Sequence, residues 1–164
     1  MSKSLRVYAF IDSQNLNLGV RSSGWRLDYK KLRLYLKNKY NVTHAFMFIG
    51  MVANNQALYT SLQAAGFILV FKPTVQYFVN GKRTVKGNVD AELVLYAAAI
   101  EYRNYDQAII VTGDGDFACL MDFLETKGKL LHVLTPNHKY SKLLQPFAHR
   151  IVHVSSLKNS LKKH

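Results

Sequence analysis

The sequence predicts an α/β fold: a mainly parallel, doubly wound sheet covered by helices on both faces, with one projecting β-hairpin. Short runs rich in β-branched and aromatic residues alternate with longer amphipathic stretches, which is the pattern of strands alternating with helices. Several of the short runs are apolar throughout, as expected for strands buried on both faces. Crossovers between parallel strands are nearly always right-handed, so the intervening helices cover both faces of the sheet.

Length and composition indicate one domain. The chain has 164 residues, which we divide into a domain over residues 1–157 and a basic C-terminal tail over residues 158–164. Its one cysteine, Cys119, cannot form an internal disulfide, so a reducing, cytoplasmic location is expected. The N-terminus lacks the pattern of a signal peptide, and the most apolar stretch, residues 45–53, is far shorter than the ~20 residues of a membrane-spanning helix.

The first half of the chain contains three expected strands and two expected helices. The first helix covers residues 28–40, with Asp28 placed to cap its start, and follows a polar loop around residues 22–25. The second helix covers residues 54–65 and is ended by Gly66. The expected strands are the β-branched and aromatic runs at residues 5–11, 42–49 and 67–71.

The second half begins with a predicted hairpin. Asn80-Gly81, the dipeptide best suited to a tight hairpin turn, separates two short strands at residues 75–79 and 82–86. Helices and strands then alternate again. The expected helices cover residues 88–102, 117–128 and 140–148, and the expected strands cover residues 107–111, 130–134 and 150–154.

Aspartates gather where predicted strands end. Asp12 follows the first strand, Asp90 opens the helix over residues 88–102, and Asp114 and Asp116 follow the strand over residues 107–111. Ligands of doubly wound sheets bind at the carboxyl ends of strands, where the strand order reverses. If the first and fourth strands are neighbours, the four carboxylates converge, and a bound divalent cation offsets their repulsion. Oxygen ligands favour Mg²⁺ or Mn²⁺ over zinc.

Each acid also has a purely structural interpretation. Asp12 and Asp116 could cap the helical turns that follow them, Asp90 could complement a helix dipole, and Asp114 could serve a turn. Four independent caps would have no reason to share one edge of the sheet. The convergence therefore favours a common site over four separate structural roles.

A dinucleotide-binding fingerprint is the rival interpretation of the segment TGDGDF, residues 112–117. Gly113, Gly115 and Ala118 have the spacing of that motif, between a strand and a helix. The aspartates within the segment would place negative charge where a pyrophosphate must lie. We therefore prefer the metal site.

The net charge of +12 predicts a polyanionic partner, with nucleic acid first and an acidic membrane surface second. Basic and aromatic residues alternate on and beside the predicted hairpin, a mixture suited to phosphate contacts and base stacking. Tyr77 and Phe78 point to opposite faces of a strand, so we expect only one of them to stack. The candidate substrate contacts are Lys72, Tyr77, Lys82, Arg83, Lys86 and Thr112, and Asn15 is a candidate to orient Asp12 or an activated water.

Three segments occur in order along the chain: FIDSQNL at residues 10–16, VKGNVDAEL at residues 85–93 and VTGDGDF at residues 111–117. Together they resemble the NYN domain, specifically its LabA-like branch within the PIN-like nuclease superfamily. The resemblance implies a Rossmann-like α/β/α sandwich, a metal site of clustered acids and endoribonuclease activity. Carried over by position, the family's acidic set corresponds to Asp12, Asp90, Asp114 and Asp116, with Asn15 and Lys86 as accompanying polar residues.

The leading hypothesis is a Mg²⁺- or Mn²⁺-dependent ribonuclease that hydrolyses RNA phosphodiester bonds. The main alternative is a non-catalytic RNA-binding or regulatory module of the same fold. A phosphatase or nucleotidase acting on small phosphate esters is a third possibility, but a charge of +12 exceeds what a mononucleotide requires. The aromatic content is also compatible with a homodimer.

Overall fold

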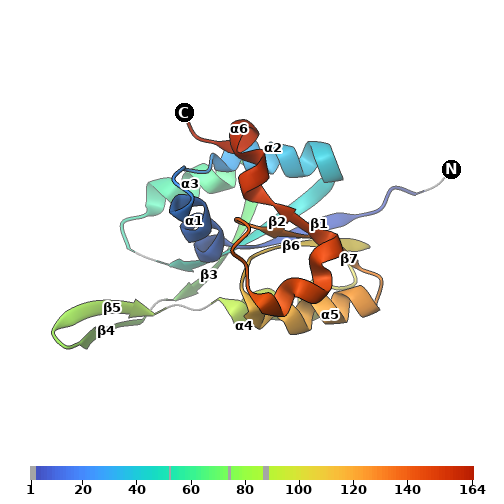
Figure 1. The fold of residues 1–164 in the computed structure, drawn as a ribbon. Coiled ribbons are helices and arrows are strands. Elements are labelled where there is room, and N and C mark those ends of the chain that lie inside the picture. The colour runs from blue at the N-terminus through green and yellow to red at the C-terminus, as the bar shows by residue number, and fades with distance from the viewer. Residues whose placement is uncertain (1–2, 52, 74, 87–88) are drawn as a thin grey trace.

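The computed structural model describes residues 3–51, 53–73, 75–86 and 89–164, with the side chains of residues 73, 75–77 and 83–86 left undescribed. A six-stranded sheet forms the middle layer, and all of its strand pairs are parallel, in the order β3-β2-β1-β6-β7-β8 (Figure 1). The predicted parallel sheet is therefore confirmed. Its strands are β1 (Val7–Asp12), β2 (Val42–Met51), β3 (Phe67–Pro73), β6 (Gln107–Val111), β7 (Leu130–Thr135) and β8 (Ile151–His153).

Helices cover both faces of the sheet and complete an α/β/α sandwich (Figure 1). One face carries α1 (Ser13–Ser22), α2 (Tyr29–Tyr40), α3 (Gln56–Ala64) and, after the 3₁₀ turn η4 (Val154–Leu157), α6 (Lys158–Leu161). The other face carries α4 (Asp90–Leu95) with its π-helical continuation η1 (Tyr96–Ile100), the 3₁₀ turn η2 (Gly115–Phe117), α5 (Ala118–Thr126) and the 3₁₀ segment η3 (Lys142–Arg150). No helix in the described part of the chain combines the length and apolar character needed to cross a bilayer.

Strand β1 shows why two apolar layers form. Its side chains alternate between the faces of the sheet, so Ala9 and Ile11 join the cluster under α1 and α2, whereas Tyr8 and Phe10 join the cluster under α4 and α5. All of these side chains are buried. A strand that is apolar from Val7 to Ile11 is stable only between two layers of helices, as the sequence predicted.

The strand order reverses at the pair β1 and β6. From β1 the chain proceeds through β2 to β3 on one side, and it then crosses to β6, β7 and β8 on the other. The two central strands are in parallel register, with Ile11 opposite Val111. Asp12 and Thr112 follow directly, so the carboxyl ends of β1 and β6 meet at the edge where the sequence predicted a ligand site.

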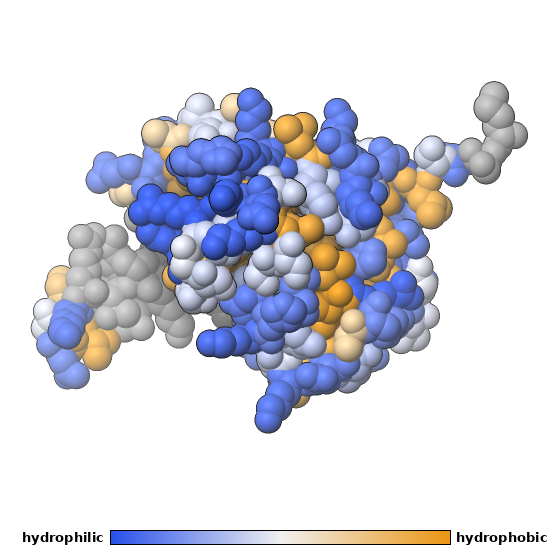
Figure 2. Space-filling view, turned by 45° about the horizontal axis from the view of Figure 1, so that its top comes forward, coloured by the Kyte–Doolittle hydropathy of each residue, from blue (hydrophilic) through white to orange (hydrophobic). Residues whose placement is uncertain are grey.

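The predicted hairpin is confirmed. Strands β4 (Val75–Val79) and β5 (Lys82–Lys86) pair in antiparallel register and extend away from the sandwich (Figure 1). Asn80 and Gly81 have φ values of 53° and 75°, the positive values that a tight turn of this kind requires. Phe78 is 76% exposed, and the described tip, at the left of Figure 2, combines hydrophilic and hydrophobic residues.

Helix α1 was not predicted beyond a possible turn at Ser13. Its sequence is mostly polar, and among its apolar residues only Leu16 and Val20 are buried, so the amphipathic stripe is too thin to recognise. The helix predicted over residues 88–102 begins at Asp90 and becomes π-helical at Tyr96, whereas Asn88 lies outside the described residues.

The segment expected as a basic tail, residues 158–164, contains a short helix. Residues 158–161 form α6, and Leu161 is 1% exposed within the core. Lys162 forms an antiparallel bridge with Leu27, which joins this segment to the start of α2. Because burial of a leucine and backbone pairing both favour order, the segment packs as part of the domain.

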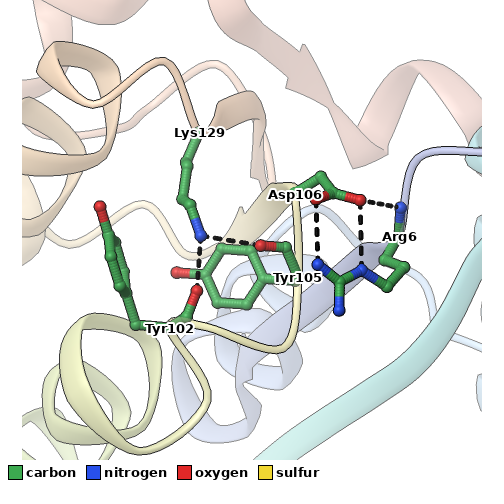
Figure 3. Close-up of polar contacts among 5 residues, drawn as sticks. All are labelled: Arg6, Tyr102, Tyr105, Asp106 and Lys129. Atoms are coloured by element: carbon green, nitrogen blue, oxygen red, sulfur yellow. Dashed lines mark hydrogen bonds and ion pairs between the residues drawn. The ribbon is translucent and has the colours of Figure 1, made fainter.

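Charged side chains form contacts at the amino ends of the strands, the end of the sheet opposite the predicted site (Figure 3). Lys129 Nζ donates to the backbone carbonyls of Tyr102 and Tyr105 and lies 4.0 Å from the centroid of the Tyr102 ring. Arg6 Nη2 lies 3.1 Å from Asp106 Oδ1, and the Arg6 hydrogen bonds lower the Asp106 pKa to about 2. These contacts join the turn after η1 to the starts of β1, β6 and β7.

We expect Lys129→Met to lower the free energy of unfolding by roughly 1–3 kcal/mol, because two carbonyl groups lose their charged hydrogen-bond donor. Urea unfolding followed by circular dichroism measures the change. Lys127→Met, at an exposed neighbouring position, is the matched control and should be close to neutral. Equal stability of the two variants would contradict this role for Lys129.

Candidate metal and catalytic site

Asp12 occupies the centre of the site, at the end of β1. Its side chain is 5% exposed and caps the N-terminus of α1, with Oδ1 accepting a hydrogen bond from the backbone N–H of Asn15 at 3.3 Å. Oδ2 accepts a hydrogen bond from Thr112 Oγ1, also at 3.3 Å. The capping role that we considered as an alternative is therefore real, and it fixes the carboxylate at the strand end.

Thr112, at the end of β6, connects two of the acids. Its hydroxyl donates to Asp12 and accepts a hydrogen bond from the backbone N–H of Asp114 at 3.1 Å. The Thr112 side chain is fully buried. Thr112 thus holds the relative positions of Asp12 and Asp114, whereas the sequence suggested direct contact with a ligand oxygen.

Asp90 completes the site from a third segment, the first turn of α4. Carboxylate oxygens of Asp12, Asp90 and Asp114 all lie within 4.8 Å of one another. Asp12 is buried, and the other two are half-buried. Three oxygen donors at this separation, without a histidine or cysteine among them, fit a hard divalent cation.

The electrostatics of Asp12 reflect this crowding. Burial, as the largest cause, and the negative charges of Asp90 and Asp114 together raise the pKa of its carboxyl group to about 6. The hydrogen bonds from Asn15 and Thr112 oppose the shift only in part. The ionised carboxylate is therefore less stable in this position than in water, and a positive charge bound beside it would offset that penalty.

Asp116, expected as a fourth acidic ligand, lies outside this group of three. Its side chain is exposed within η2, and its backbone N–H donates to Asp114 Oδ1 at 2.9 Å. Asn15 differs in detail from the expectation as well. Its backbone contacts Asp12, while its side-chain oxygen accepts a hydrogen bond from the Gly113 N–H at 2.8 Å. Asn15 therefore joins α1 to the loop after β6.

Of the basic candidates, Lys72 forms an ion pair that the sequence did not predict. Its Nζ lies 3.4 Å from Glu92 Oε2 on α4. Glu92 stands two residues after Asp90 in the segment VKGNVDAEL. That proximity to Asp90 could have identified Glu92 as a residue near the site. Lys82 is exposed at the hairpin tip. The side chains of the remaining hairpin candidates lie outside the described residues: Tyr77, Arg83 and Lys86.

The loop at residues 136–141, which follows β7, was not predicted from the sequence as part of the site. This loop and α1 border a pocket of about 280 Å³ that reaches Asn15 and Gly113. The loop follows a parallel strand at the same edge as the acids and carries Lys139 and Tyr140. That position and composition were the signals that could have identified it.

The fold and the site together define the class of protein: an α/β sandwich with an acidic, metal-compatible site at the switch point of its sheet. The chain belongs to the NYN domain family, within the PIN-like nuclease superfamily, since the NYN domain model matches residues 6–155. The family and the fold expected from the three sequence segments are both confirmed.

Two related proteins illustrate the similarity. Over 166 residues the chain is 22% identical to the Low amplitude and bright protein LabA of Synechococcus elongatus, covering 96% of this chain and 88% of LabA. The crystal structure of a protein of unknown function from Vibrio parahaemolyticus matches with a TM-score of 0.81 and 21% identity, covering 99% of this chain and 100% of the other. The structural match shows a shared fold.

We expect Asp12→Asn to stabilise the metal-free protein. The pKa of Asp12 is about 6 in the folded protein and ordinarily 3.8. Between these pH values the native state binds more protons than the unfolded state, so the free energy of unfolding falls as the pH rises. Asparagine removes the charge and still caps α1. The gain in unfolding free energy should be roughly 1–3 kcal/mol above about pH 7 and shrink towards about pH 4.

Urea unfolding at several pH values, with a chelator present, measures this difference. Asp116→Asn, at an exposed acid in η2, controls for the loss of one negative charge. A lower stability of Asp12→Asn than of the unmodified protein near neutral pH would show that burial does not penalise this carboxylate.

Proposed function

We propose that this protein is a metal-dependent endoribonuclease that hydrolyses RNA phosphodiester bonds at Asp12, Asp90 and Asp114. The supporting observation is the meeting of these three carboxylates within 4.8 Å at the switch point of an NYN domain. The net charge of +12 supports a polyanionic substrate. Mg²⁺ or Mn²⁺ is the proposed cation, because all of the donors in the group are carboxylate oxygens.

The three aspartates would hold the cation, which when bound activates water and stabilises negative charge on the scissile phosphate. Thr112 keeps Asp12 and Asp114 at a fixed separation, so little reorganisation is needed when the cation binds. No protein nucleophile is required. Cys119 is exposed, and its contact is to the Asp116 carbonyl oxygen at 3.9 Å, an arrangement that supplies no base to activate it.

Most of the proposed substrate contacts belong to the hairpin that projects from the sandwich. Lys82 and the exposed Phe78 at the hairpin tip would approach the phosphates and bases of a bound strand. We assign Tyr77, Arg83 and Lys86 of the same hairpin to this surface, and we place Asp116 and Asn15 at the rim of the catalytic centre. Lys72 is a weaker candidate, because Glu92 already balances its charge.

A non-catalytic RNA-binding module is the second candidate. The exposed position of Asp116 favours it, since the group compatible with a metal then contains three acids and not the expected four.

We further propose a cytoplasmic location, which the single free cysteine supports. A homodimer is compatible with the aromatic content of the chain.

Asp114→Asn should reduce RNA cleavage by more than about 100-fold, because one of the proposed metal ligands loses its charge. The asparagine oxygen can still accept the hydrogen bond from the Asp116 N–H, so we expect the fold to be retained. Labelled RNA incubated with Mn²⁺, with and without chelator, reports the activity. Asp122→Asn, at an exposed acid on α5, is the control. Unchanged cleavage by Asp114→Asn would refute the proposed site, and chelator-sensitive fragments would exclude the binding-only module.

Saturating Mn²⁺ should stabilise the unmodified protein by about 2.7 kcal/mol at a concentration ~100-fold above Kd. Thermal melting across an Mn²⁺ titration measures the effect without any substrate. The shift should disappear in Asp12→Asn and persist in Asp122→Asn. An equal shift in all three proteins would indicate that Mn²⁺ binds elsewhere.

A further inference from the structure

The carboxyl edge of the sheet contains a second feature beside the acids. A pocket of about 280 Å³ lies between α1 and the loop over residues 136–141. Asn15 and Gly113 line this pocket, and they also belong to the loop and helix that carry Asp12 and Asp114. The pocket is therefore lined by residues close in the chain to two of the candidate metal ligands, Asp12 and Asp114.

Hydrogen bonds and close packing join the loop over residues 136–141 to α1 and to the loop after β6. Asn137 Nδ2 donates to the Gly19 carbonyl at 2.9 Å, and its Oδ1 accepts from the Lys139 N–H at 2.8 Å. Gly19 permits direct contact between α1 and the loop, since an added Cβ would lie 2.4 Å from Pro136 Cβ. The Ser141 N–H donates to the Gly113 carbonyl at 3.1 Å. The pocket is thus formed before any ligand binds.

The lining combines aromatic, apolar and positively charged groups. The half-buried ring of Tyr140 packs against that of His153, with centroids 5.6 Å apart and ring planes inclined by 28°, and this contact limits its orientation. Leu18 is 57% exposed beside it, and Lys139 is exposed at the mouth. An aromatic face with an adjacent ammonium group is suited to one nucleotide, whose base stacks while its phosphate contacts the cation.

The position of the pocket relative to the acids indicates which nucleotide of a bound strand it would hold. The hairpin leaves the sheet at β3, the acids lie at the ends of β1 and β6, and the loop over residues 136–141 follows β7. These strands follow one another across the sheet, so the acids lie between the hairpin and the pocket. An RNA strand that contacts the hairpin and crosses the acids reaches the pocket on the far side.

We propose that this pocket binds the nucleotide adjacent to the scissile phosphate of an RNA strand, with Tyr140 stacking on its base and Lys139 contacting its phosphate. This assignment rests on the proposed ribonuclease function and extends it to a defined subsite. A pocket of about 280 Å³ accommodates a single nucleotide and leaves the remainder of the strand to the open surface.

Binding of a short, fluorescently labelled single-stranded RNA tests the proposal, measured by anisotropy with a chelator present so that metal-dependent cleavage is suppressed. Tyr140→Leu should weaken binding roughly 5- to 100-fold through loss of stacking, and Tyr140→Phe should restore it. Lys139→Gln should weaken binding more than Lys39→Gln does. Lys39 is exposed at the end of α2, near the opposite edge of the sheet, so both variants carry the same net charge.

Cleavage in Mn²⁺ and the Mn²⁺-dependent melting shift are measured on the same proteins. A retained melting shift in Tyr140→Leu shows that the fold and metal site are intact. Unchanged RNA binding in both Tyr140→Leu and Lys139→Gln would overturn the pocket assignment. A ribonucleoside monophosphate that binds as tightly as the RNA would overturn the assignment to an RNA strand. Lack of cleavage by the unmodified protein contradicts the proposed function alone, because the binding comparison still decides on the pocket.

Discussion

The close approach of three carboxylates is the constraint on which this structure depends. Asp12, Asp90 and Asp114 come from three separate elements, and one of them is almost fully removed from water. Burial and mutual repulsion both raise the energy of the charged state, as the raised pKa of Asp12 indicates. Such an arrangement persists because the surrounding fold stabilises it, and a bound cation would remove most of its cost.

The fold supports this arrangement through a small number of local contacts. The Thr112 hydroxyl connects the end of β1 with the loop after β6, and the Asn15 side chain connects α1 with the same loop. Close backbone packing adds to these hydrogen bonds. A Cβ at Gly115 would lie 2.3 Å from Ser141 Oγ, so the acidic loop and the segment after β7 are in direct contact. Asp12, Asp114 and the adjacent pocket are thus joined by direct contacts.

Charge is distributed in a way that suits a polyanionic substrate. The chain as a whole is strongly basic, while its acidic cluster is confined to the switch point of the sheet. A positive field would attract a nucleic acid from a distance, and the local negative charge would hold a cation for its phosphate. The hairpin, with the exposed Lys82 near its tip, projects beyond the sandwich (Figure 1).

The sequence by itself determined the sheet, most of the helices and the hairpin. Fully apolar runs such as residues 108–111 require burial on both faces, and Asn80-Gly81 supplies the positive φ values of a tight turn. These signals are local, because propensity and periodicity act over a few neighbouring residues. The three segments that resemble the NYN domain also indicated the family.

Only the tertiary structure decided which side chains meet. It brought Asp90 to Asp12 and Asp114, left Asp116 exposed, paired Lys72 with Glu92 and packed the chain end against α2. Each of these outcomes depends on strand register, helix rotation and contacts between residues distant in the chain. A sequence pattern specifies which face or end of an element a residue occupies. The distances between elements arise from how the apolar layers pack, and that packing is a property of the whole domain.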